Sequence, residues 1–181
     1  FSNIYSLSIG EGELLISPLK LANLAATIAN RGWYISPHYI KGIGKLDEGI
    51  PEKYREKHYT DINAKYYLPV IEGMRMAVVA GTVKKEADIN GIDLCGKTGT
   101  SQNAKFGHAH DHSIFIGFAP MNNPKIAIAV FVENAGWGGV AAASVAALVA
   151  GRYASRTKEA HQLPSGTSKE KHSPPLSMRA P

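Results

Sequence analysis

The chain has 181 residues, of which 44% are hydrophobic, a composition typical of one compact domain with a hydrophobic core. Its formal net charge is +5, but no basic run is interleaved with aromatic residues, so nucleic acid is not expected as a partner. The single cysteine, Cys95, excludes an internal disulfide and a cysteine-based zinc cluster.

The chain begins at Phe1 without the charged and apolar pattern of a leader peptide. Its longest run of small apolar residues, 140–150, is far shorter than the ~20 residues that a membrane-spanning helix needs. We therefore expect the chain as given to be soluble. Because it begins in the middle of a sequence pattern, we also expect it to be part of a longer protein.

The first strong helix signal covers residues 18–31. Ser17 suits the N-cap and Pro18 suits the first helical turn, where no N–H is required. Gly32 suits the left-handed position that ends many helices. The apolar residues at helical spacing are predicted to face the core, namely Leu21, Leu24 and Ile28.

A second helix is predicted over residues 66–80, closed by Gly81. Its predicted inner face contains Val70, Met74, Ala77 and Val78. The segment before it is aromatic and charged; residues 39–43 are compatible with a short strand, and 45–61 are predicted to be a solvated insertion.

Three strands and a closing helix are predicted in the second half, over 91–100, 112–120, 125–134 and 139–153. The turn-forming residues 121–124 indicate that the last two strands form an antiparallel hairpin. Ile114, Ile116 and Phe118 are predicted to share one face, and the apolar run 125–133 is typical of a strand covered on both faces.

The predicted fold class is therefore α+β, with an antiparallel sheet flanked by helices. Beyond Ser155 the chain is rich in Ser, Pro, Lys and His and has few apolar residues with which to form a core. The predicted organisation is a folded part over 1–154 and a disordered tail over 155–181.

The most informative stretch is Gly91–Thr100, because two chemistries can be drawn from it. Residues 91–98 match the phosphate-binding loop pattern G-x-x-x-x-G-K-[ST], whereas Lys97–Thr100 reads Lys-Thr-Gly-Thr, as in serine acyl-transfer enzymes. A phosphate loop needs a buried strand before it and a helix after it, and the flanking residues predict neither. We favour a strand, while the strand-like run 126–133 keeps a nucleotide-binding alternative open.

As a strand, this stretch has a chemical purpose. Lys97 and Thr98 would point to opposite faces, and Gly99, without a Cβ, would let an extended ligand approach the backbone. An ammonium and hydroxyls there would hold a peptide carboxylate, and backbone N–H groups would stabilise an oxyanion. An ordinary edge strand with a solvent-exposed lysine is the plain alternative.

Four motifs in order extend the pattern. Besides Lys97–Thr100, they are Gly10-Glu11-Gly12 followed by Ser-Pro-Leu-Lys-Leu-Ala at 17–22, Gly-Met-Arg at 73–75 with 78–82, and Asp-His-Ser-Ile-Phe-Ile-Gly-Phe-Ala-Pro at 111–120. Together they resemble class B penicillin-binding proteins of the elongation type, the penicillin-binding protein 2 group. The resemblance covers about residues 5–153.

The resemblance implies the C-terminal part of a penicillin-recognising serine transpeptidase fold. It implies a peptidoglycan DD-transpeptidase that cross-links stem peptides ending in D-Ala-D-Ala and that β-lactams acylate as mimics of that peptide. Lys97 is then a catalytic residue, and Thr98, Gly99 and Thr100 bind substrate, with no metal and no cofactor. The implied partners are the cell-elongation machinery and its membrane glycosyltransferase. The implied location is the periplasmic face of the bacterial inner membrane, through an N-terminal anchor outside this chain.

The resemblance also implies that the nucleophilic serine of S-x-x-K and the S-x-N motif precede Phe1. Ser17 and Lys20 fit S-x-x-K formally, but we interpret Ser17 as a helix cap. We therefore expect this chain to be inactive by itself. A non-catalytic β-lactam-sensing or scaffold module with the same strand is a further hypothesis.

Three other features have plain structural interpretations. His108, His110 and His112 form an H-x-H-x-H spacing, but we expect His112 to be structural and the other two to lie in an exposed loop. Cys95 is predicted to be a small core residue. Trp137 is predicted to pack over the core, with a place in the substrate groove as the alternative.

Overall fold

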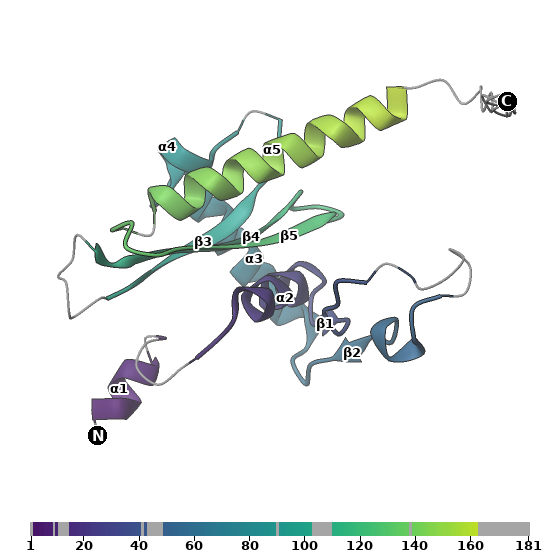
Figure 1. Ribbon diagram of the computed structural model, residues 1–181, viewed down its shortest axis with the longest axis horizontal. Coiled ribbons are helices and arrows are strands. Elements are labelled where there is room, and N and C mark those ends of the chain that lie inside the picture. Colours follow the sequence, from purple (N-terminus) through teal and green to yellow (C-terminus); the bar gives the residue numbers. More distant parts are fainter. Residues whose placement is uncertain are drawn as a thin grey trace, which may run out of the picture.

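A computed structural model describes residues 2–8, 10, 15–40, 42, 49–89, 91–102, 110–137 and 139–162. Its centre is a three-stranded antiparallel sheet in the order β3-β4-β5, formed by β3 (Cys95–Ser101), β4 (His112–Ala119) and β5 (Ile126–Val132). Helices cover both faces of this sheet (Figure 1). One face carries α2 (Pro18–Ala29) and α3 (Tyr67–Val79); the other carries α4 (Lys84–Ala87) and α5 (Ala141–Gln162). The predicted α+β class is confirmed.

The strand register separates the residues of the sheet into two faces. Thr98 lies opposite Phe115, which lies opposite Val130, and this row faces α5. The alternating rows face α2 and α3, and Ile114, Ile116 and Phe118 lie on that side, as predicted. The hairpin between β4 and β5 is also confirmed; the Lys125 N–H donates to the Ala119 carbonyl at 2.8 Å across its turn.

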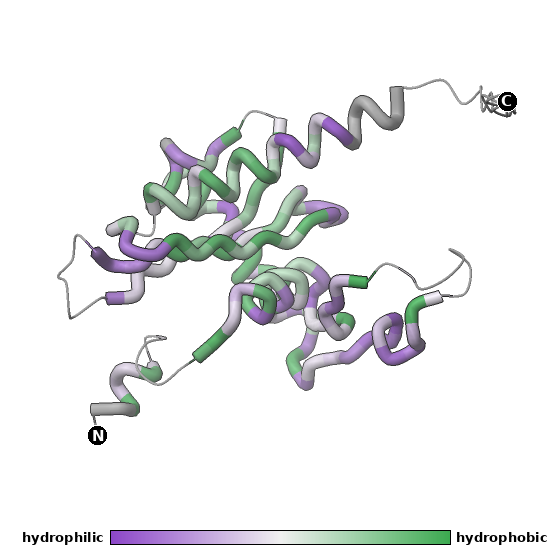
Figure 2. Tube along the Cα trace, viewed as in Figure 1, coloured by the Kyte–Doolittle hydropathy of each residue, from purple (hydrophilic) through white to green (hydrophobic). Residues whose placement is uncertain are grey.

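Small residues let α5 lie close to the sheet. Phe115, Ile128 and Leu94 pack against buried alanines of this helix. These alanines are Ala142, Ala143, Ala146, Ala147 and Ala150. Figure 2 shows the apolar residues concentrated along the strands, in contrast to the largely hydrophilic segment around β2.

The opposite core differs in part from the predicted helix faces. It contains Ala29, Tyr67, Ile71, Met74, Cys95 and Phe118. Leu24 and Val70 were predicted to face inward, but each side chain is 47% exposed. Both helices carry apolar residues on several faces, so spacing alone cannot choose the face that meets the sheet. In α2 the small Ala25 and Ala29 take that place, since they allow a close approach.

Helix α2 ends at Ala29, two residues before the predicted end, and its left-handed position is one residue earlier than predicted. Arg31, not Gly32, holds the compact left-handed conformation, with φ of 59°, and Gly32 follows with φ of 108°. The Arg31 N–H donates to the Ile28 carbonyl and the Gly32 N–H to the Thr27 carbonyl, at 3.0 and 2.9 Å. This pair of hydrogen bonds is the Schellman motif. Gly32 is still required, since a Cβ there would lie 3.0 Å from Thr60 and Tyr67.

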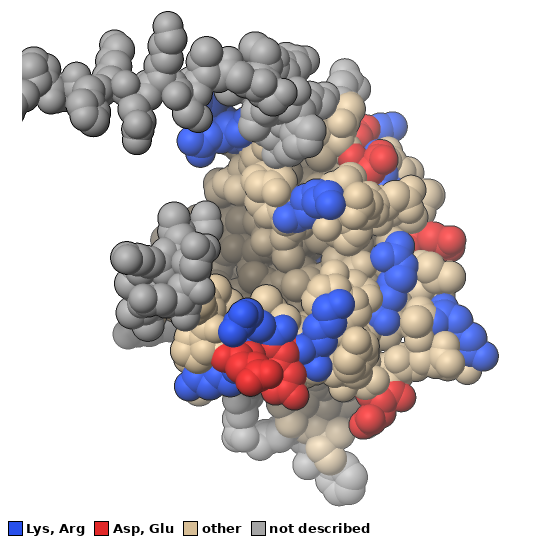
Figure 3. Space-filling view, turned by 90° about the vertical axis from the view of Figure 1, so that its right-hand side faces the viewer, with Lys and Arg blue, Asp and Glu red and all other residues tan. Residues whose placement is uncertain are grey.

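The charged segment between α2 and α3 forms a small ribbon instead of the strand considered at 39–43. Its strands are β1 (Trp33–Tyr34) and β2 (His58–Tyr59), which pair antiparallel. Short 3-10 turns, η1 (Glu52–Tyr54) and η2 (Ala64–Tyr66), flank β2. Tyr39 and Ile40 lie outside any strand, and residues 41 and 43–48 are outside the described ranges. On the face in Figure 3, basic side chains are scattered among acidic ones.

The structure differs from the expected arrangement near both ends of the chain. A short helix α1 (Ser2–Ser8) stands near the N-terminus. Helix α5 continues to Gln162, so residues 155–162 of the expected disordered tail are helical, and 163–181 lie outside the described residues. Within the described ranges, no helix is long and apolar enough to cross a membrane.

Candidate functional site

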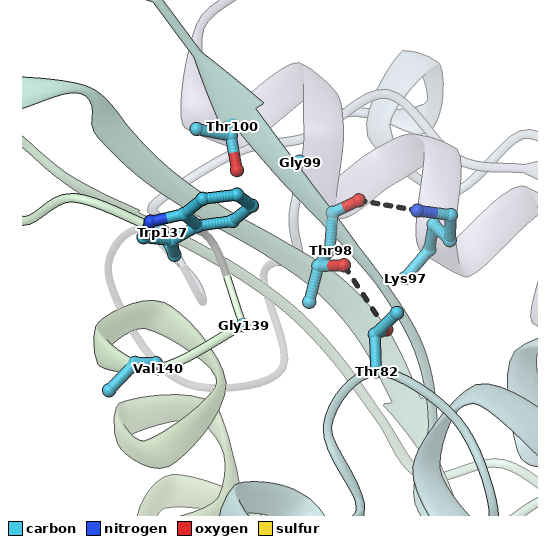
Figure 4. Close-up of a pocket in the computed structure, with 8 residues that line it drawn as sticks. All are labelled: Thr82, Lys97, Thr98, Gly99, Thr100, Trp137, Gly139 and Val140. Atoms are coloured by element: carbon cyan, nitrogen blue, oxygen red, sulfur yellow. Dashed lines mark hydrogen bonds between the residues drawn. The ribbon is translucent and has the colours of Figure 1, made fainter. Parts of the chain in front are cut away.

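A cavity of about 550 Å³ lies beside β3, at the end of the sheet near the start of α5. Three segments build it: the strand residues 97–100, the turn after α3, and the connector from β5 to α5. Its lining is Thr82, Lys97, Thr98, Gly99, Thr100, Trp137, Gly139 and Val140 (Figure 4). The four residues singled out from the sequence as a possible site therefore line one cavity.

The structure excludes the phosphate-loop alternative. Lys97 and Thr98 lie inside β3, which runs to Ser101, so no helix begins at the lysine to present N–H groups to a phosphate. The nucleotide-binding interpretation of residues 91–98 is wrong, because the second half of the supposed loop, residues 95–98, is strand and the motif leads into no helix. The favoured strand interpretation is confirmed for residues 95–100, whereas residues 91–94 of the predicted strand precede β3 and include a turn at Gly91.

Lys97 and Thr98 leave β3 on opposite faces, as predicted (Figure 4). The Lys97 Nζ donates to the carbonyl oxygen of Thr98 at 2.7 Å. That carbonyl therefore points away from β4, toward the edge of the described sheet where β3 is the last strand. An ammonium is thus held beside the backbone edge that an extended ligand would pair with.

On the α5 side of the strand, hydroxyl groups converge. The Thr82 and Thr98 hydroxyls lie 3.4 Å apart and share a hydrogen bond. Gly139 comes close to both residues, because a Cβ there would meet the Thr82 carbonyl oxygen at 3.1 Å and the Thr98 methyl group at 4.0 Å. Neither Thr82, which the sequence offered only as the end of the 78–82 motif, nor Gly139 was predicted as a site residue. Their contact with β3 exists only once the connector and the turn have been brought together.

Trp137 corrects the expectation that it packs over the core. Its side chain is 77% exposed, and its ring lies on the side of β3 that carries Thr98 and Thr100 (Figure 4). The sequence signal was present in the glycines at 136, 138 and 139, which suit a connector that presents a side chain instead of burying it.

A second cavity of about 390 Å³ lies on the other face of β3. Lys97 and Thr82 line both cavities, and residues of α3 and its C-terminal end complete the second. They are Gly73, Met76, Ala77, Ala80 and Gly81. Lys97 is the one titratable side chain among the described residues that line either cavity, so the site is suited to bind an anionic ligand.

The remaining sequence candidates have structural roles. Ser17 is exposed and caps α2, where its hydroxyl accepts the Lys20 N–H at 3.4 Å. Its interpretation as a helix cap is confirmed. Cys95 is fully buried, and burial raises the pKa of its thiol to about 11, with Arg75 opposing and Asp93 adding to the shift. Its predicted core position is confirmed.

The histidine pattern does not form a metal site among the described residues, where no cluster of three potential ligands exists. His112 accepts the Asn134 N–H through Nδ1 at 3.1 Å and contacts the Phe131 ring, so its predicted structural role is confirmed. His110 is exposed, and His108 lies outside the described residues.

Comparison with known proteins gives one consistent result. The penicillin-binding protein transpeptidase domain family matches residues 1–150. The peptidoglycan D,D-transpeptidase MrdA of Haemophilus influenzae is 34% identical over 167 residues, and MrdA of Acinetobacter baumannii is 32% identical over 158. These matches cover 82% and 76% of this chain but only 25% and 22% of the relatives, so the chain spans about a quarter of their length.

Solved structures agree. A ceftriaxone acyl-enzyme complex of penicillin-binding protein A from Mycobacterium tuberculosis superposes with a TM-score of 0.65 and 28% identity, covering 80% of this chain and 34% of that one. Pseudomonas aeruginosa PBP2 in complex with WCK 5153 gives 0.60 and 31%, covering 90% and 34%. Sequence and fold lead to one assignment: the chain belongs to the family of penicillin-binding protein transpeptidase domains.

Proposed function

We propose that the chain is the part of a peptidoglycan D,D-transpeptidase that binds the D-Ala-D-Ala end of a stem peptide in the Lys97 cavity. The observation that carries this proposal is the meeting of an ammonium, two threonine hydroxyls and an edge-strand backbone in one cavity. Family membership and relatives named D,D-transpeptidases support it.

The ligand chemistry follows from the groups along β3. A stem peptide ends in a carboxylate, for which Lys97 supplies the positive charge and Thr98 and Thr100 supply hydroxyl donors. The peptide backbone adds as an extended strand along the edge, where Gly99 has no Cβ to hold it away. Trp137 covers the ligand's apolar side. Lys97 is also the proposed catalytic lysine, beside the reacting group.

A β-lactam occupies the same cavity in this proposal, because it presents a carboxylate and an acyl group in a similar arrangement. The Mycobacterium tuberculosis relative forms an acyl-enzyme with ceftriaxone, which supports this extension. Acylation requires an activated serine, and we place that serine in a part of the longer protein outside these 181 residues. Ser17 is not a candidate, since its hydroxyl caps α2.

The same reasoning extends to partners and location. A related chain with 25% identity belongs to a peptidoglycan synthase complex that coordinates polymerisation and cross-linking. We propose a glycosyltransferase of the cell-elongation machinery as the partner, and the periplasmic face of the bacterial inner membrane as the location, with an anchor elsewhere in the protein.

The binding step can be tested on the chain alone. An N-acetylated peptide ending in D-Ala-D-Ala is titrated while the fluorescence of Trp137 is followed in a Trp33→Phe background; the chain has two tryptophans. The peptide should bind and its L-Ala-L-Ala counterpart should not. Lys97→Ala should weaken binding about tenfold or more, since a hydrogen bond to a charged group contributes ~1.5–3 kcal/mol. Lys125→Ala, on the turn before β5, is the matched control.

The catalytic part is tested on the full-length protein with a fluorescent penicillin. Covalent labelling that is lost in Lys97→Ala supports the transpeptidase. Peptide binding by the chain without any labelling of the full-length protein would favour the non-catalytic β-lactam-sensing module. If the chain does not bind the peptide and the full-length protein is not labelled, both hypotheses are refuted.

A further inference from the structure

The position of Trp137 is set by its backbone. With 77% of its side chain exposed, the indole ring has little packing of its own to hold it beside β3. Asn134 and Gly136 take left-handed conformations, with φ of 52° and 73°, so the connector from β5 to α5 follows a sharply turning path. Something outside the connector must hold that path for the ring to face the cavity.

Three successive residues at the start of β4 provide this hold. The Asp111 carbonyl accepts the Gly136 N–H at 2.9 Å, and His112 Nδ1 accepts the Asn134 N–H at 3.1 Å. Ser113 makes two further bonds; its hydroxyl donates to the Trp137 carbonyl at 3.3 Å and accepts the Ala142 N–H at 3.0 Å. One side chain therefore joins the Trp137 backbone to the first turn of α5.

Ser113 is also placed to link this connector to the binding strand. It is fully buried and lies directly opposite Thr100 in the β3–β4 register, on the face that carries Thr98. The Trp137 carbonyl accepts a second hydrogen bond, from the Val140 N–H at 3.1 Å, which closes the turn that brings Gly139 toward Thr98. The hydroxyl thus lies beneath the wall of the Lys97 cavity, beyond reach of a ligand.

We propose that Ser113 is a positioning residue: its hydroxyl sets where Trp137 stands relative to Thr98 and Thr100, and thereby the affinity of the Lys97 cavity for its ligand. The identity of that ligand is taken from the proposed function, and this part of the inference rests on it. The placement of Trp137 by Ser113 is independent of it.

The test follows Trp137 directly. The chain is labelled with fluorotryptophan in a Trp33→Phe background, so that its fluorine NMR spectrum reports Trp137 alone. Ser113→Ala should shift and broaden the resonance, and Ser113→Thr, which keeps the hydroxyl, should restore it. The matched control is Ser155→Ala farther along α5, whose hydroxyl bonds within its helix, to the Gly151 carbonyl at 3.0 Å.

Ligand affinity is the second readout. Ser113→Ala should bind the D-Ala-D-Ala peptide about tenfold more weakly, because the free energy of about one hydrogen bond corresponds to a tenfold change in affinity. Ser155→Ala should match the unchanged chain. A folded Ser113→Ala chain with an unchanged resonance and affinity would overturn the proposal. If Ser113→Ala does not fold, Ser113→Cys, which keeps the volume, is judged by the same criteria.

The two proposals fail separately. If the unchanged chain binds no peptide, the proposed function loses its support, and the fluorine resonance alone decides the role of Ser113. If the peptide binds and Ser113→Ala changes neither readout, the cavity keeps its proposed function and Ser113 loses its role.

Discussion

Gly96 lies directly opposite Gly117 in the β3–β4 pair, and the ring of Phe115 fills the space that their missing side chains leave on the α5 face. A Cβ on Gly96 would overlap this ring, and one on Gly117 would lie 2.5 Å from the Cys95 carbonyl oxygen. The strand that carries Lys97 is therefore held against β4 by two glycines that no side chain can replace.

Gly96→Ala should consequently destabilise the fold by about 1–3 kcal/mol or more, since overpacking forces a buried ring from its place. Urea unfolding followed by circular dichroism measures the change. Gly99→Ala is the control on the same strand, because a Cβ there would meet Ile114 at an ordinary 3.5 Å. Equal losses for the two variants would contradict the role given to Phe115.

Thr98→Val should weaken peptide binding about tenfold while changing the free energy of unfolding by less than about 1 kcal/mol. The substitution keeps the shape and removes a hydroxyl whose partner, Thr82, lies at the long distance of 3.4 Å. Thr82→Val breaks the same Thr–Thr contact without removing the ligand's donor on β3. A similar loss of affinity in both variants would mean that the Thr82–Thr98 hydrogen bond is needed to shape the site, and that the Thr98 hydroxyl does not bind the ligand directly.

Arg75 connects α3 to the segment before β3 through a hydrogen bond and an ion pair, which should contribute unequally to the free energy of unfolding. Its guanidinium donates to the buried Leu94 carbonyl at 3.0 Å and to the Asp93 carboxylate at 3.3 Å, where the Asp93 side chain is 59% exposed. Arg75→Met should cost about 1–3 kcal/mol, because it leaves a buried carbonyl without this donor. Asp93→Asn should cost less than about 1 kcal/mol, as exposed ion pairs do. Comparable urea midpoints for the two variants would mean that the ion pair, and not the hydrogen bond to the Leu94 carbonyl, provides the stabilisation by Arg75.

Cys95 should resist thiol reagents in the folded chain. Burial raises the pKa of its thiol from 9.0 to about 11, so the reactive thiolate is scarce at pH 8 and is also covered. A disulfide reagent should react with it only after urea unfolds the chain. Rapid reaction of the native chain at pH 8 would contradict the buried position.

The same shift predicts a pH dependence of stability. The folded-state pKa lies above the unfolded one, so the stabilisation is complete below pH 9 and is lost as the pH rises through 11. The stability difference between the unchanged chain and Cys95→Ala should shrink over this window, by at most roughly 2–3 kcal/mol. A difference that stays constant from pH 8 to 11 would contradict it.

Local sequence signals were enough to predict the two helices α2 and α3, the three strands of the main sheet and the helix α5, but not α1, α4 or the β1–β2 ribbon. Proline and serine at the start of α2, the turn residues at 121–124 and the apolar alternation along 112–119 are local signals, and each element formed where they indicated. The strand that carries Lys97–Thr100 was predicted from the apolar alternation of Ile92, Leu94 and Gly96, although β3 begins only at Cys95, so that Ile92 and Leu94 precede it.

Which helix faces are buried, and which residues complete the cavity, depends on how the elements pack together. Leu24 and Val70 are as apolar as their buried neighbours, and only the closeness of the sheet favours Ala25 and Ile71 in their place. Thr82 comes from a segment far from Trp137 and Gly139 in the chain. They meet Lys97 because α3 packs on β3, while the connector is hydrogen-bonded to Asp111 and Ser113 at the start of β4. Their role depends on distances between segments, such as the 3.3 Å from the Ser113 hydroxyl to the Trp137 carbonyl, which no local pattern encodes.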